Sequence, residues 1–105
     1  MTEQAQLGLA AIQQQMKELD EIAKKTMEDL NTVAGTERVT KWKAQTAALL
    51  SQAIGESEGK AFASQQPGPS FTNDLFEEFT DLVDYYRSAL QTMAKKLGSS
   101  LPKTG

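Results

Sequence analysis

Apolar residues spaced three and four apart fill two long stretches of this chain, and this spacing constrains the fold more than any other feature. Side chains at this period share one face of an α-helix, whereas a strand would show a period of two. Residues 3–33 contain no proline and predict one long helix. Thr26 occupies one position of this series, and the others hold Ala5, Leu9, Ile12, Met16, Leu19, Ala23, Leu30 and Val33.

A glycine and a threonine separate this helix from a second, shorter one. Gly35 suits the left-handed conformation that ends many helices, and Thr36 is a favourable N-cap. We therefore expect the second helix over residues 37–54, with Gly55 ending it. Its apolar side consists of Val39, Trp42, Leu49, Leu50, Ala53 and Ile54.

Residues 55–72 are expected to form a loop, because a Pro-Gly-Pro sequence fixes turns and disfavours helix. A short helical turn around Lys60–Ala63 is compatible with this segment, and Phe62 and Phe71 are expected to cover one end of the bundle. A third helix is predicted over 73–97, capped by Thr72 or Asn73 and ended by Gly98. Residues 99–105 are expected to be a disordered tail. The seam of the third helix consists of Phe76, Phe79, Leu82 or Val83, Tyr86, Leu90, Met93 and Leu97.

These elements predict an all-α domain over residues 1–98, a three-helix up-down bundle with long first and third helices. The middle helix is too short to cover the apolar faces of the first and third helices, which would leave part of these faces exposed to solvent in a single chain. We therefore expect a homo-oligomer, with a dimer favoured. The alternative is that the segment with Phe62 and Phe71 closes the bundle of a single chain. The expected interface residues are Leu9, Ile12, Met16, Leu19, Phe79, Leu82, Val83, Tyr86, Leu90 and Met93.

The composition excludes several kinds of active site. The 105 residues include no cysteine and no histidine, which removes disulfides, zinc fingers, thiol nucleophiles and imidazole bases. The sequence also lacks a phosphate-binding glycine-rich loop and a G-x-S-x-G motif. We expect no enzymatic activity, no cofactor and no metal. The absence of a long apolar run or a secretory signal predicts a cytoplasmic protein without a membrane segment.

Two charged clusters are candidate sites for a partner. Arg38, Lys41 and Lys43 surround Trp42 where positive charge opposes the helix dipole, so they either pair with Glu28 and Asp29, stay solvated or contact nucleic acid. Nucleic acid is disfavoured by the net charge of −3, and Trp42 is expected in the core. The second cluster lies on one face of the third helix and is either solvated or a docking surface for a basic protein: Asp74, Glu77, Glu78, Asp81 and Asp84.

Two short segments resemble known families, and a third motif is incomplete. The positions Val39, Trp42, Thr46, Leu49, Leu50, Gly55, Glu56, Ser57 and Phe62 resemble a helical pattern in bacterial proteins whose helical region precedes a TIR-like, nucleotide-binding or other defence effector module. Residues Leu101, Pro102, Lys103, Thr104 and Gly105 match the L-P-x-T-G motif that sortases cleave, but the apolar stretch and basic residues of a sorting signal are missing. A tag or a coincidence explains this match better. The W-x-G motif of small secreted helical hairpins is incomplete, because Lys43 and Ala44 follow Trp42.

The sequence thus predicts a non-enzymatic helical module for oligomerisation and protein interaction. The resemblance to defence proteins implies an alternative, a regulatory or sensing component of a bacterial antiphage system. A small secreted or sortase-anchored helical protein is a further alternative.

Overall fold

Four helices, and not the predicted three, build the part of the chain that the computed structural model describes, residues 2–68 and 73–100. They are α1 (Thr2–Asp29), α2 (Thr32–Ala53), α3 (Glu56–Ala63) and α4 (Leu75–Ser100). No strand occurs among these residues. The all-α prediction is therefore confirmed, and the helix count is corrected.

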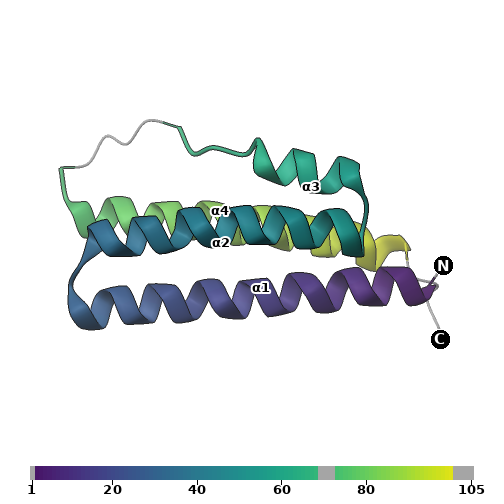
Figure 1. The fold of residues 1–105 in the computed structure, drawn as a ribbon, viewed down its shortest axis with the longest axis horizontal. Coiled ribbons are helices and arrows are strands. Elements are labelled where there is room, and N and C mark those ends of the chain that lie inside the picture. Colours follow the sequence, from purple (N-terminus) through teal and green to yellow (C-terminus); the bar gives the residue numbers. More distant parts are fainter. Residues whose placement is uncertain (1, 69–72, 101–105) are drawn as a thin grey trace.

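The three long helices lie side by side in a bundle of 47 × 25 × 22 Å (Figure 1). α1 packs against both α2 and α4, and the short α3 packs against α2 on the side away from α1. α4 begins at the end of the bundle that holds the α1–α2 turn, so it runs antiparallel to α1. The start of α1 and the end of α4 lie together at the opposite end (Figure 1).

Helix α3 falls in the segment that was predicted to be a loop. Phe62 is fully buried and meets the rings of Trp42 and Tyr86 at centroid distances of 5.8 and 5.9 Å. Gly59 lets α3 approach α2 closely, because a Cβ at this position would lie 1.8 Å from Ser51 Oγ. Phe62 therefore enters the core near the middle of α2 and α4, and the prediction that it covers one end of the bundle is wrong. Phe71 lies outside the described residues.

The boundary between α1 and α2 was predicted at Gly35 and Thr36, and this prediction is wrong. The break lies at Leu30 and Asn31, where the Asn31 side chain caps α2 by accepting a hydrogen bond from Ala34 N at 3.0 Å. Gly35 lies inside α2 and is buried. A Cβ on Gly35 would lie 2.5 Å from the Thr26 side chain, so this glycine serves helix packing instead of ending a helix.

The predicted limits of the last helix also need correction. Asp74, and not Asn73, caps α4, since its Oδ1 accepts a hydrogen bond from Phe76 N at 2.8 Å. Thr72, the other predicted cap, lies outside the described residues. The helix continues past Gly98 to Ser100, into the segment that was predicted to be a disordered tail. Residues 101–105, which hold the sortase-like motif, lie outside the described part of the chain.

The seam residues that were assigned to an interface between copies lie largely inside the single chain. Ile12, Leu19 and Leu90 are fully buried, and Leu9, Met16, Leu82 and Met93 are half-buried. The remaining members, Phe79, Val83 and Tyr86, are at most 5% exposed. The expectation that this stripe stays wet in a lone chain is therefore wrong. α2 is longer than predicted, and α3 adds Phe62 to the same core.

Two buried hydrogen bonds join α1 to α2 at the centre of the bundle. Gln15 Nε2 donates to Thr46 Oγ1 at 2.7 Å, and Trp42 Nε1 donates to the main-chain oxygen of Gln15 at 2.9 Å. Gln15, Thr46 and Trp42 are all at most 4% exposed. Because a buried polar group without a partner is costly, these bonds fix the register of the two helices.

Gly59→Ala is expected to lower the free energy of unfolding by about 2 kcal/mol or more, because the new methyl group would overlap Ser51 Oγ and the Ala47 carbonyl oxygen. Gly98→Ala is the matched control. Nothing lies within 4 Å of its added Cβ, so helix propensity should raise stability by about 0.5–1 kcal/mol. Urea unfolding followed by circular dichroism measures both. Equal effects of the two substitutions would contradict the close contact of α3 with α2.

Gln15→Leu is expected to lower the free energy of unfolding by about 1–3 kcal/mol, because it leaves the buried Thr46 hydroxyl without its donor. Adding Thr46→Val should recover most of this loss, since both polar partners are then replaced by apolar groups. The exposed Gln13→Leu is the control and should change stability little. A double variant no more stable than Gln15→Leu alone would show that the bond does not couple the helices.

Candidate functional site

The turn between α1 and α2 holds a leucine in an unfavourable backbone conformation. Leu30 has φ 55°, in the left-handed region, and its side chain is 67% exposed. A residue with a Cβ in this region costs about 1–2 kcal/mol, which is why glycine or asparagine usually occupies this position after a helix. A branched apolar side chain here therefore lowers stability twice, through backbone strain and through exposure to water.

The charges beside this turn are also unfavourable for the helix that they end. Glu28 and Asp29 stand in the last turn of α1, which has no basic residue, although acidic side chains oppose the helix dipole there. Asp29 is partly compensated, since its Oδ2 pairs with Arg38 Nη2 at 3.3 Å and its Oδ1 accepts from Asn31 N. Local stability does not explain the sequence of this turn.

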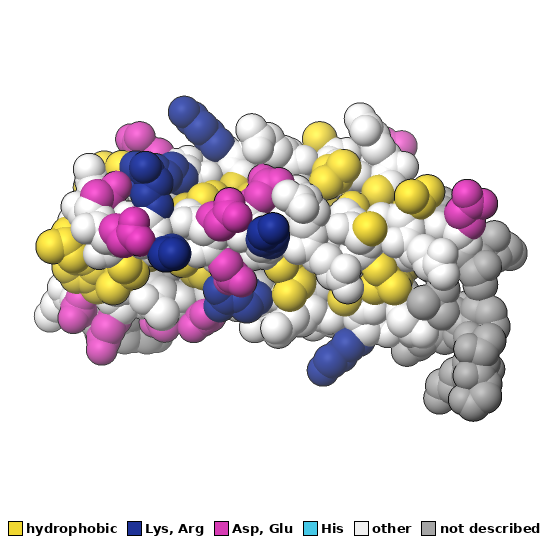
Figure 2. Space-filling view, turned by 90° about the horizontal axis from the view of Figure 1, so that it is seen from below, with side chains coloured by type: hydrophobic (Ala, Val, Ile, Leu, Met, Phe, Trp, Pro, Cys, Tyr) yellow, Lys and Arg dark blue, Asp and Glu magenta, His cyan; other side chains and the backbone are white. Residues whose placement is uncertain are grey.

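Among the residues that the structure describes, four of the five exposed large hydrophobic side chains lie at this end of the bundle. We call them the apolar end: Met27 (48% exposed), Leu30 (67%), Val33 (69%) and Leu75 (61%). Three flank the α1–α2 turn and the fourth starts α4, which begins at the same end (Figure 1). Hydrophobic side chains gather at this end of the surface in Figure 2. The fifth such residue, Leu7, lies on α1 toward the other end.

An acidic face extends from the apolar end along α4. It consists of the five carboxylates that the sequence analysis selected, Asp74, Glu77, Glu78, Asp81 and Asp84, and all of them are exposed. Asp74 also caps the helix, and Asp84 Oδ1 accepts from Arg87 Nη1 at 2.8 Å. Arg87 bonds to Asp20 of α1 as well, so this arginine ties α4 to α1. Leu75 lies one helical turn before Glu78, so the acidic face adjoins the apolar end.

The basic cluster around Trp42 does not form one site. Trp42 is 2% exposed and belongs to the core, which confirms the core prediction and removes its ring as a stacking platform for a partner. Arg38 pairs with Asp29, as one of the alternatives predicted. Lys43 turns to the other side, where Nζ donates to the Gln65 carbonyl oxygen at 2.6 Å and lies 5.2 Å from the centre of the Tyr86 ring. Lys41 is exposed.

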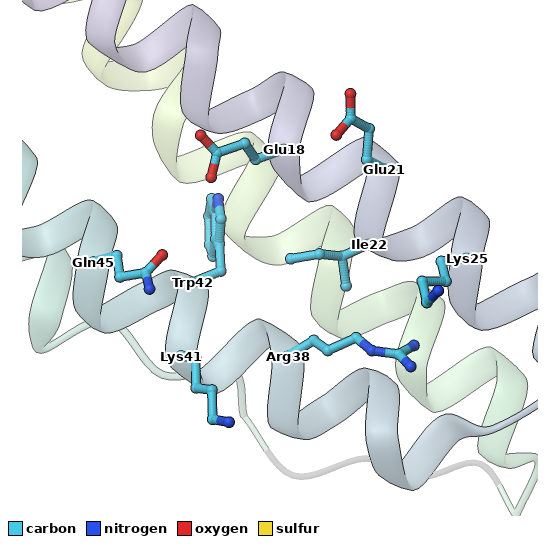
Figure 3. Close-up of a pocket in the computed structure, with 8 residues that line it drawn as sticks. All are labelled: Glu18, Glu21, Ile22, Lys25, Arg38, Lys41, Trp42 and Gln45. Atoms are coloured by element: carbon cyan, nitrogen blue, oxygen red, sulfur yellow. The ribbon is translucent and has the colours of Figure 1, made fainter.

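A pocket of about 380 Å³ lies between α1 and α2 (Figure 3). Ile22 and Trp42 form its apolar lining, and the other lining residues are Glu18, Glu21, Lys25, Arg38, Lys41 and Gln45. Both signs of charge face it, so its electrostatics select neither an anion nor a cation. Arg38 Nη1 is buried and lacks a hydrogen-bond partner among the described residues.

The described residues, 2–68 and 73–100, form neither a metal site nor a membrane-spanning helix. No group of three or more carboxylates there is placed to hold a metal ion, and none of the helices is long and apolar enough to cross a membrane. Comparisons with protein-family models, curated proteins and solved structures find no match to this chain. The candidate site is therefore the apolar end together with the acidic face.

Sequence reasoning missed the apolar end because Leu30 and Val33 continue the three-four spacing of the first helix. They were assigned to its seam, yet both are exposed. The usable clue was Asn31, a favourable N-cap that follows Leu30 and lies four positions before the glycine that was taken as the helix end.

Leu30→Gly is expected to raise the free energy of unfolding by about 0.5–1 kcal/mol, because glycine relieves the left-handed strain. Leu30→Ala removes the same apolar side chain but keeps a Cβ, so it should not produce this gain. Denaturant midpoints of the three proteins test the difference. If Leu30→Ala stabilises as much as Leu30→Gly, strain at this residue is not the cause.

Proposed function

We propose that this chain is a non-enzymatic helical module that binds another protein through its apolar end. The observation that carries the proposal is the α1–α2 turn, where Leu30 combines a positive φ with an exposed apolar side chain. Residues that lower the stability of the fold and serve neither packing nor capping are typical of functional surfaces.

The exposed side chains are not the result of a core that is too small to hold them. Ten large hydrophobic residues form one buried cluster, with additional half-buried ones packed around it. Leu30, Val33 and Leu75 nonetheless remain more than half exposed, and together with Met27 they lie at the same end of the bundle. Grouped apolar side chains with a charged border are typical of protein-binding surfaces.

Self-association remains part of the proposal in a changed form. The α1 and α4 seam residues pack within the chain, so they no longer favour a dimer. A second copy of the chain would instead have to occupy the apolar end. The resemblance to helical modules of bacterial defence proteins stays a prediction, and most residues that carry it, including Val39, Trp42 and Phe62, are buried here.

The experiment uses the purified full chain to capture proteins from its native host, followed by reconstitution of the complex from the two purified components. Leu30→Gly combined with Val33→Ser should weaken binding of that partner by about tenfold or more, as expected for anchor residues of an interface. The same variant should remain folded, because both side chains are exposed. In this variant the affinity for the partner should therefore fall while the fold is kept.

Leu7→Ser is the matched control, since Leu7 is 61% exposed but lies toward the other end of α1. It should leave the affinity unchanged. Equal losses in the control and in the Leu30→Gly, Val33→Ser variant would rule out the apolar end as the binding surface. A complex that both variants form as tightly as the unmodified chain would do the same.

A further inference from the structure

Building on the proposed function, we infer that the partner segment at the apolar end is a basic amphipathic helix. Its apolar residues would cover Leu30, Val33 and Leu75, and its lysine or arginine side chains would lie along the acidic face of α4. The inference names the chemistry of the partner, which the proposed function leaves open.

Continuity of the two surfaces is the first argument. Leu75 belongs to the apolar end, and Glu78 follows it by three residues, so their side chains are neighbours on the surface of α4. Asp81 lies three residues beyond Glu78 on the same face. A ligand that covers Leu75 therefore meets carboxylates immediately beside it.

The charge of this face is the second argument. From Asp74 to Asp84 the chain carries five carboxylates and no basic residue. Asp74 caps α4 and Asp84 bonds to Arg87, whereas the side chains of Glu78 and Asp81 make no ion pair within the described residues. Glu28 adds a further exposed carboxylate beside the α1–α2 turn. Basic side chains at the edge of an apolar contact complement this potential.

Size favours a helix as the occupant. The bundle as a whole is 25 × 22 Å along its two shorter axes, and a helix of roughly 15 residues is about 22 Å long, which is comparable to this width. Such a helix spans the end and presents several apolar side chains from one face. A second copy of this chain fits less well, because it would bring its own acidic face and net charge of −3 to the same place.

The test measures binding of a synthetic amphipathic helix of leucine and lysine, about 15 residues long, to the full chain by calorimetry and by amide chemical shifts. A peptide of the same pattern with glutamate in place of lysine is the charge control. We expect the leucine–lysine peptide to bind and to shift residues 27–33 and 75–81. The leucine–glutamate peptide should bind at least about tenfold more weakly.

Two pairs of variants locate the contact. Leu30→Gly with Leu75→Ser removes apolar anchors, and Glu78→Lys with Asp81→Lys reverses the free carboxylates. Each pair should weaken the leucine–lysine peptide by about tenfold. The control Glu3→Lys with Glu58→Lys makes the same change in net charge at exposed positions near the other end of the bundle, and it should change affinity by less than about twofold.

Three results would overturn the inference. The first is an equal loss in the Glu3→Lys, Glu58→Lys control, which would show unspecific attraction to an acidic protein. The second is a leucine–glutamate peptide that binds the apolar end as well as its basic counterpart; binding through Leu30 and Val33 would survive that result, so the proposed function would stand. The third is a stable dimer of the chain that buries the apolar end and is lost in Leu30→Gly with Leu75→Ser.

Discussion

The arrangement of the bundle depends on how Gln15 and Trp42 join α1 to α2. A seam of apolar side chains permits neighbouring registers at similar cost, but a buried amide and a buried indole N–H need partners at fixed positions. Thr46 and the Gln15 carbonyl oxygen supply them. With this register set, Gly35 meets Thr26 and Phe79, and Trp42 is placed against Phe62 of α3 and Tyr86 of α4. These two hydrogen bonds thus align side chains from all four helices.

Regular packing along most of the bundle makes the α1–α2 turn conspicuous by contrast. Elsewhere the chain follows local preferences: Asp74 caps α4, and Gly35 and Gly59 lie where two helices approach closely. At Leu30 a glycine would suit the backbone better, and at Val33 a polar residue would suit the solvent better. Because the core is complete without these side chains, a binding role explains their presence better than folding does.

Periodicity predicted the parts of the fold in which side-chain burial decides the structure. The spacing of Ile12, Leu19, Phe79, Tyr86 and Leu90 identified two long helices and most of the core correctly. The period failed to locate the helix ends, because Leu30 and Val33 continue the apolar pattern into and beyond a turn. Gly35 was also ambiguous, since a glycine can either end a helix or allow close packing inside one. Of α3, whose eight residues are too few to show a period, the sequence allowed a single turn around Lys60–Ala63. Of the candidate site, the acidic face followed from the sequence, whereas the apolar end required knowledge of where α1 stops.

The ends of α1 and α4 lie together at the end of the bundle opposite Leu30 (Figure 1). Any polypeptide joined to either helix would therefore leave the bundle at the pole opposite the proposed binding surface. Such a layout would suit a protein that is attached through this pole, because the proposed binding surface at the other pole would stay exposed. A fluorophore or an immobilisation handle could use the same geometry without shielding the surface of interest.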